Sequence, residues 1–164
     1  MPRAYWMNES HPQLSAQVML LEPSTTMFER LQTVVAQSDN NASEMDILSN
    51  IFYDSALVLP HRKYNLVTSE LRKKDDEHSA YLGSDDEAWD VDAVMAEASY
   101  LHFSDWPVRK PWVTNNDWFL RSYAPACKKR KGQAPDCHQR EIWQDFYSDF
   151  LTRRRKVCGI EDVN

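Results

Sequence analysis

The sequence predicts an α/β domain in which a mixed sheet is flanked by helices. The first observation is an apolar run at 14–22, which is too short for most helices and indicates a buried strand. The second is helical periodicity of apolar residues up to about residue 37 and again around 47–52, followed by a short apolar run at 56–59. This strand–helix–helix–strand order favours α/β layering over a helical bundle.

Two serines mark the starts of the predicted helices. Pro23 ends the first apolar run, and Ser24 can cap the helix that follows it. After a polar loop at 39–41, Ser43 can cap the second helix in the same way.

The second half of the chain is expected to be more irregular. In chain order we expect a loop with one helical turn at 64–74, an acidic and poorly structured insertion at 75–90, a short helix at 91–98, a strand at 100–103, a loop around 123–138 and the longest helix at 139–157. We therefore divide the chain into a main part, 1–122, and a basic loop with a C-terminal helix, 123–164.

Composition excludes some kinds of function. The chain has 164 residues, enough for one domain with its own core. It has only three glycines, where average usage would give roughly ten, and no glycine-rich phosphate loop. Its net charge of −6 argues against a nucleic-acid partner. It also contains neither a signal peptide nor a long apolar run that could cross a membrane.

The three cysteines leave two interpretations open. Cys127 and Cys137 flank a short loop and could close a disulfide in an oxidising compartment. Alternatively, these two cysteines and His138 could bind zinc, although their spacing matches no recognised zinc motif.

The segment richest in chemistry runs from His102 to Trp112. A histidine that leaves a strand is well placed to bind a divalent metal ion, and Lys110 supplies a compact positive charge for a diphosphate. The residues alone also allow a structural interpretation, in which His102 is a hydrogen-bonded core histidine.

The pattern His102-Phe103, then Lys110-Pro111-Trp112, resembles the late motif of glycosyltransferase family 8, the glycogenin-like retaining enzymes. The resemblance implies a fold of the GT-A type, of which this chain would hold the C-terminal part. It also implies that His102 binds manganese, that Lys110 contacts the diphosphate of the sugar donor, and that Trp112 shapes the loop beside it.

A second segment supports the resemblance. The run Leu14 to Ser24 is similar to the family's strand that ends in Pro-Ser, with Ser15 and Gln17 at positions where the family usually has asparagine and glycine. The nearest subgroup is fungal, the glucose N-acetyltransferase-like or N-acetylglucosaminyltransferase proteins. The resemblance implies that Ser15 and Gln17 contact the donor.

A third segment, Ser43 to Phe52, is similar to a helix start of the family. Glu44 falls on the family's acidic position, whereas Asp46 falls on a glycine. We name both as candidate catalytic carboxylates, which could stabilise positive charge on the donor or position the acceptor. The alternative is structural, because acids in the first turn of a helix interact favourably with its dipole.

The metal-binding Asp-x-Asp of such enzymes is expected before this segment of the fold, and losing it should disable catalysis. Asp90-Val91-Asp92 matches the Asp-x-Asp pattern, but no predicted strand leads into it. We interpret it as a helix start with Asp90 as the N-cap. The chain is therefore expected to be a truncated form that is inactive alone.

The resemblance implies an enzyme that transfers a sugar such as N-acetylglucosamine, from a nucleotide-sugar donor such as UDP-N-acetylglucosamine, to a glycan acceptor, with manganese as the cofactor. It implies a longer parent protein in the Golgi lumen, anchored in the membrane. The alternative is a non-catalytic remnant that binds a glycan or a partner. Without the rest of the sheet, exposed edges and apolar faces favour association, including a homo-oligomer.

Overall fold

The computed structural model describes residues 1–7, 10, 12–113, 117–129 and 131–159. The chain forms two compact units, and each consists of several segments. The first unit comprises Met1–Leu66, Ser79–Glu87 and Val94–Leu101, and the second unit comprises Val67–His78, Ala88–Ala93 and His102–Asn164. The predicted domain boundary after residue 122 stays a prediction.

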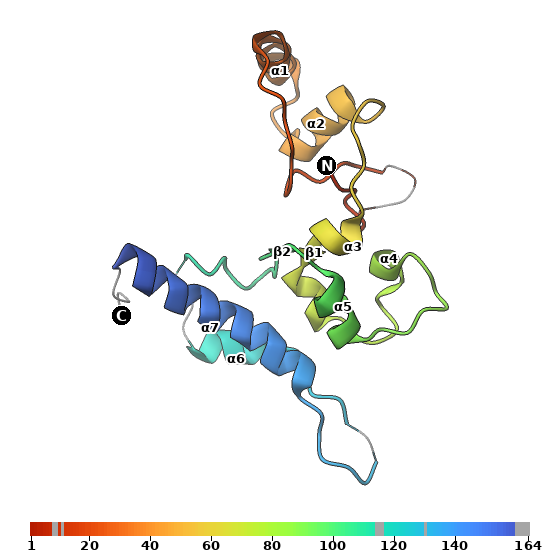
Figure 1. Ribbon diagram of the computed structural model, residues 1–164, viewed down its shortest axis with the longest axis vertical. Helices are drawn as coiled ribbons and strands as arrows, with labels where there is room; N and C mark the ends of the chain where they lie inside the picture. The colour runs from red at the N-terminus through yellow and green to blue at the C-terminus, as the bar shows by residue number, and fades with distance from the viewer. Residues whose placement is uncertain (8–9, 11, 114–116, 130, 160–164) are drawn as a thin grey trace. The chain divides into compact units, whose positions relative to one another are not determined.

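The first two helices confirm the expected periodicity and caps. Helix α1 spans Thr25–Gln37, and the Oγ of Ser24 accepts a hydrogen bond from the amide of Met27 at 3.3 Å. Helix α2 spans Glu44–Phe52 and packs against α1 (Figure 1). No residue of α1 is buried, so its apolar stripe is largely exposed.

The two predicted strands of the first unit are not formed, and this part of the prediction is wrong. Leu14 is fully buried and makes only an isolated bridge to Arg3, while Leu59 makes another to Pro2. Leu20 is 93% exposed, as expected for a segment with no neighbouring strand. The apolar pattern is present, but a strand also needs a continuous hydrogen-bonded neighbour, and the described residues supply only these isolated bridges.

Two further short helices belong to the first unit. Helix α3 spans His61–Tyr64, and α4 spans Ser79–Leu82 within the segment expected to be poorly structured. Tyr81 joins them, because its hydroxyl donates to the carbonyl of Arg62 at 2.9 Å and its own carbonyl lies 2.6 Å from the Nε2 of His61. A buried tyrosine thus orders the acidic insertion locally.

The described part of the chain contains a single small sheet. Strand β1, Leu66–Val67, pairs with β2, Leu101–His102, and β1 leads into a 3₁₀ helix at Thr68–Arg72. Strand β2 confirms the strand expected at 100–103, although it is shorter. The larger mixed sheet of a GT-A fold stays a prediction.

Of the three remaining helices among the described residues, α5 and α7 were expected and α6 was not. Helix α5 spans Val91–Glu97, and the Oδ1 of Asp90 accepts from the amides of Asp92 at 3.0 Å and Ala93 at 3.2 Å. Asp90 is therefore the N-cap, as the sequence predicts. Helix α6, Asp117–Tyr123, was not expected.

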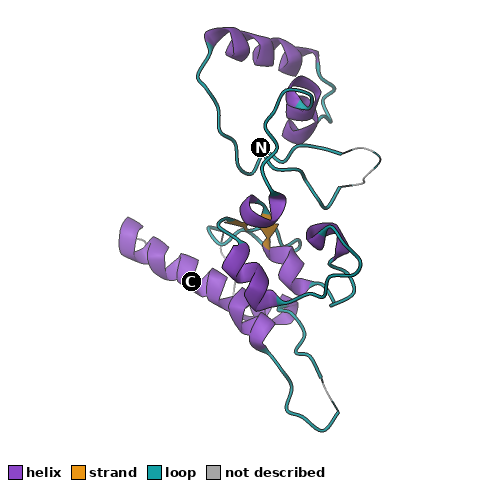
Figure 2. Ribbon diagram, turned by 45° about the vertical axis from the view of Figure 1, so that its right-hand side comes forward, coloured by secondary structure: helices purple, strands orange, loops and turns teal. Residues whose placement is uncertain are grey.

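Helix α7 is the longest helix and the main support of the second unit. It spans His138–Cys158 and ends at Gly159, which has a φ of 61° (Figure 2). Its apolar stripe includes Trp143, which is fully buried, and Tyr147, which is 2% exposed. None of the described helices is long and apolar enough to cross a membrane.

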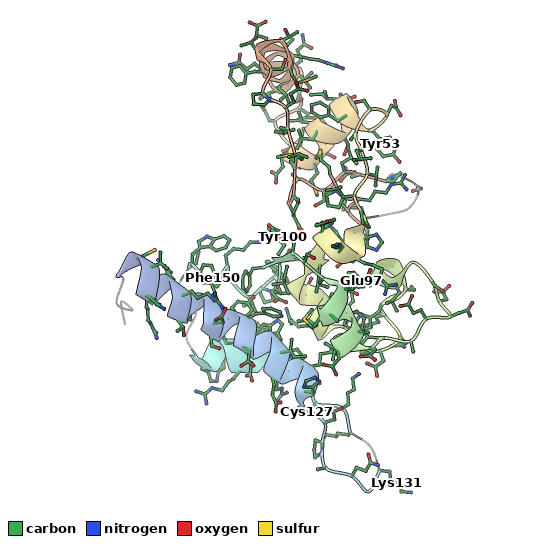
Figure 3. All side chains as sticks on the ribbon, in the orientation of Figure 1. Tyr53, Glu97, Tyr100, Cys127, Lys131 and Phe150 are labelled. Atoms are coloured by element: carbon green, nitrogen blue, oxygen red, sulfur yellow. A yellow bond between two sulfur atoms is a disulfide. The ribbon has the colours of Figure 1, made fainter. Side chains whose placement is uncertain are left out.

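A disulfide closes the loop before α7. The backbones of Lys128 and Asp136 pair at 2.7 and 2.9 Å. Cys127, labelled in Figure 3, is bonded to Cys137. This confirms the disulfide interpretation and excludes both sulfurs as zinc ligands. His138 instead pairs with Asp92 at 2.7 Å.

Candidate active site

The structure brings together the two residues that the late motif singles out. His102 is the last residue of β2, and its Nε2 lies 2.9 Å from the Nζ of Lys110. The ammonium group also donates to the carbonyl of Phe103 and lies 6.0 Å from the ring centre of Trp112. The loop from 103 to 112 therefore folds back so that its lysine returns to the end of the strand.

A buried carboxylate holds this loop in place. Asp105 is 3% exposed, and its Oδ2 accepts hydrogen bonds from the Nε1 of Trp143 at 2.7 Å and the hydroxyl of Tyr147 at 3.0 Å. Its Oδ1 lies 3.3 Å from the Nη1 of Arg72. We call Asp105, Arg72, Trp143 and Tyr147 the Asp105 cluster. It ties the loop to the 3₁₀ helix and to α7.

The Asp105 cluster depends on two aromatic residues that are one helical turn apart on α7. Trp143 and Tyr147 are four residues apart, so they lie on the same face of α7 and can reach one carboxylate together. Burial, followed by the negative charge of Asp105, raises the pKa of Tyr147 far above its usual value. Tyr147 therefore stays protonated and remains a hydrogen-bond donor.

Burial also lowers the pKa values of His102 and Lys110. It lowers the pKa of His102 below its ordinary value of 6.5, and the positive charge of Lys110 lowers it further. Burial likewise lowers the pKa of Lys110, and Asp105 opposes this effect. At neutral pH the imidazole is accordingly neutral, with Nε2 free of a proton and able to accept from the ammonium group.

We expect NMR titration to give His102 a pKa below 6.5, because protonation would place two positive charges next to each other. His138 is expected to titrate above 6.5, because it gains a hydrogen bond from its ring to Asp92. Replacing Lys110 by methionine should raise the pKa of His102 and leave that of His138 unchanged. A His102 pKa that does not move in Lys110→Met would contradict the pairing.

The same shift predicts how His102 affects stability. Its pKa is lower in the folded state than in the unfolded state, so the unfolded chain binds more protons between the two values. The contribution of His102 to stability is thus complete above pH 6.5 and is lost as the pH falls from 6.5 through the folded-state pKa.

The described residues do not by themselves fit a manganese ion. Among them, no group of three or more histidine, cysteine, aspartate or glutamate side chains is arranged to hold a metal. The Nε2 of His102 faces the ammonium group of Lys110, whose charge would repel a cation. One imidazole beside an ammonium group suits an anionic oxygen better.

The candidates of the first unit are Ser15, Gln17, Glu44 and Asp46. Ser15 is fully buried, and its hydroxyl donates to the Oδ1 of Asn65 at 3.1 Å. Asn65 in turn donates to the carbonyl of Arg3 at 2.9 Å. The Oε1 of Gln17 is buried without a hydrogen-bond partner among the described residues. These contacts give Ser15 a structural role, and donor contacts by Ser15 and Gln17 stay predictions.

The two candidate carboxylates lie at the start of α2. Asp46 forms a capping box with Ser43, and hydrogen bonds from the hydroxyl and then the backbone of Ser43 lower its pKa. Its other oxygen accepts from Gln13. Glu44 is exposed in the first turn. The capping box supports the structural interpretation of Asp46, and a catalytic role for either residue stays a prediction.

Sequence reasoning missed the residues that support the site. Trp112 was expected beside Lys110 and lies there, 50% exposed. Asp105, in contrast, lies in the segment between His102 and Trp112, but the sequence pattern indicated no role for it. The available signal was the pair of aromatic donors at 143 and 147, together with the one acidic residue of the tryptophan- and proline-rich loop at 103–112.

Comparison with known proteins gives clear relatives. The chain is 45% identical over 161 residues to glucose N-acetyltransferase 1 of Gibberella zeae, covering 96% of this chain and 34% of that protein. It is also 45% identical over 170 residues to glucose N-acetyltransferase 1 of Aspergillus fumigatus, covering 96% of this chain and 44% of that protein. The chain therefore spans between a third and a half of the length of these curated relatives.

More distant relatives carry the same name. Glucose N-acetyltransferase 1 of Saccharomyces cerevisiae is 24% identical over 182 residues, covering 88% of this chain and 36% of that protein. No family model and no solved structure matches the chain. The chain is thus similar, along nearly all of its length, to part of proteins that are named as transferases.

Proposed function

We propose that this chain is part of a glycosyltransferase related to the fungal glucose N-acetyltransferases, and that the whole protein transfers N-acetylglucosamine from a nucleotide-diphosphate donor to a glycan. Identity of 45% over 96% of the chain supports the relationship. The resemblance of the late motif to glycosyltransferase family 8 supports the kind of reaction and implies retention of the anomeric configuration.

The observation that carries the proposal is the pairing of Lys110 with His102 at 2.9 Å. A lysine held at the end of a strand by an imidazole and a backbone carbonyl presents a positive charge of defined position. When the donor binds, we expect Lys110 to donate to an oxygen of its diphosphate, while neutral His102 keeps the ammonium group oriented. Opposing the negative charge of the leaving diphosphate is the main electrostatic task in this chemistry.

The loop also offers surfaces for sugars. Trp106 and Trp112 are 90% and 50% exposed, and both lie within the loop that Asp105 anchors. Exposed indoles can pack against the apolar faces of sugar rings while their N–H groups bond to hydroxyls. We therefore assign Trp112 to the donor side of the loop, next to Lys110.

The resemblance implies a manganese ion, which would supply further charge neutralisation at the diphosphate. Because the described residues offer one imidazole beside an ammonium group, they leave the carboxylate ligands of such an ion to other parts of the whole protein. The disulfide between Cys127 and Cys137 supports a location in an oxidising compartment, in line with the Golgi lumen.

Calorimetric titration with UDP-N-acetylglucosamine tests the proposal. The chain should bind the nucleotide sugar in a buffer with a chelator, and Lys110→Met should weaken binding roughly 10-fold or more, because a charge-assisted hydrogen bond contributes about 1.5–3 kcal/mol. Lys129→Met is the matched control, since Lys129 is an exposed lysine of the loop before α7 and should bind as the wild type does.

Two results would count against the proposal. Equal weakening by Lys129→Met and Lys110→Met would show only general electrostatic attraction. Binding of N-acetylglucosamine oligosaccharides with no preference for the nucleotide sugar would favour a glycan-binding remnant instead, acting through the exposed indoles.

A further inference from the structure

The loop between α1 and α2 contains the sequence Asn41-Ala42-Ser43. An asparagine followed by any residue except proline and then by serine or threonine is the acceptor pattern for N-linked glycosylation. The pattern alone is weak, because many such sites are buried or belong to proteins that never enter the secretory pathway. Two features of this structure make it stronger.

The first feature is the local geometry at Asn41. The loop turns at Asp39, whose carbonyl accepts from the amide of Ala42 at 2.9 Å and whose Oδ1 accepts from the amide of Asn41 at 3.2 Å. Asn41 is exposed in this turn, and among the described residues its side-chain amide has no hydrogen-bond partner. The nitrogen that would carry a glycan is therefore accessible and not needed by the fold.

The second feature is independent of this loop. Cys127 and Cys137 form a disulfide, and disulfides form and persist in oxidising compartments such as the lumen of the endoplasmic reticulum. The transferase that modifies asparagine acts in the same lumen. The disulfide thus places this exposed acceptor in the kind of compartment where the donor is found.

We propose that Asn41 is N-glycosylated. In this step the Nδ2 of Asn41 forms a bond to the anomeric carbon of an oligosaccharide carried by a lipid diphosphate. The bond between that carbon and the diphosphate oxygen breaks, and the lipid diphosphate leaves with the bonding electrons. The amide nitrogen loses one proton, which passes to the surrounding water, and no oxidation or reduction takes place.

The fold also indicates when the step occurs. In the folded chain the hydroxyl of Ser43 is the N-cap of α2, because it accepts from the amide of Asp46 at 3.2 Å and donates to its carboxylate at 2.7 Å. Recognition of the acceptor needs this hydroxyl, so modification takes place before α2 is capped. The finished glycan is then attached three residues before Glu44, the first residue of α2.

Mass spectrometry of chains sent to the lumen of a eukaryotic host tests the proposal. A second acceptor pattern, Asn8-Glu9-Ser10, lies largely outside the described residues, so the experiment uses Asn8→Gln as its background. A known glycosylated sequence is appended to the C-terminus, and only molecules in which it is modified are counted. Peptide N-glycosidase then converts each modified asparagine into aspartate.

We expect Asn41 to be converted in most of the counted molecules and Asn41→Gln to lose the mass of one glycan. Ser43→Thr keeps both the acceptor pattern and the cap, and it should remain modified. Ser43→Asp keeps a capping residue but removes the acceptor, and it should lose the glycan. Unmodified Asn41 in molecules whose appended sequence is modified would overturn the proposal. None of these outcomes depends on transferase activity.

Discussion

Replacing Asp105 by alanine is expected to lower the free energy of unfolding by about 3–5 kcal/mol, the usual cost of removing one partner from a buried charge pair. The carboxylate is 3% exposed and accepts from Trp143 and Tyr147 while facing Arg72. Alanine would leave two buried donors without their acceptor, and the guanidinium group of Arg72 would lose its charge partner. Urea unfolding followed by circular dichroism measures the change.

Two further variants show whether the loss of stability comes from the Asp105 cluster or from the removal of any carboxylate. Asp105→Asn keeps one acceptor oxygen and should cost less than Asp105→Ala. Asp149→Ala removes a carboxylate that pairs with Arg153 on the exposed face of α7, and it should change stability by less than about 0.5 kcal/mol. Equal stability of Asp105→Ala and the wild type would show that the cluster does not hold the loop.

The second large effect is expected at Trp143, which is fully buried on α7. Trp143→Ala should cost about 3–5 kcal/mol, because it removes a large buried ring and leaves a cavity. Trp143→Phe keeps most of the ring and loses the 2.7 Å bond to Asp105, so it should cost about 1–3 kcal/mol. Unfolding of both variants in urea gives these values.

A double-mutant cycle measures the interaction free energy between Asp105 and Trp143. Combining Trp143→Phe with Asp105→Asn should cost less than the sum of the single changes, with a coupling of about 0.5–3 kcal/mol. Trp118→Ala is the control, since Trp118 is 72% exposed and its loss should have little effect. Strict additivity at positions 105 and 143 would mean that the hydrogen bond does not contribute.

The helices could be predicted from the sequence because their signals are local. Ser24, Ser43 and Asp90 cap the helices that the apolar periodicity predicts, and α7 spans nearly the expected range. Strands depend on partners that are distant in the chain. The run at 14–22 has the composition of a strand, yet among the described residues it forms only one bridge, at Leu14.

Likewise, only part of the candidate site could be predicted from the sequence. His102 and Lys110 are eight residues apart, and a resemblance to a known motif was enough to predict that they act together. The Asp105 cluster was not predictable, because the partners of Asp105 on α7 lie 38 and 42 residues further along the chain. Glu44 and Asp46 carried both a catalytic and a structural interpretation in the sequence, and the capping box showed how the side chain of Asp46 is used.

NMR of the His102 ring during addition of UDP-N-acetylglucosamine tests most directly whether the lysine–histidine pair is the diphosphate site. When Lys110 turns to a diphosphate oxygen, its hydrogen bond to the Nε2 of His102 changes, so the ring signals of His102 should shift in a saturable way. The signals of His138, which pairs with Asp92, should not shift. Unchanged His102 signals at concentrations where the nucleotide sugar is bound would contradict the account.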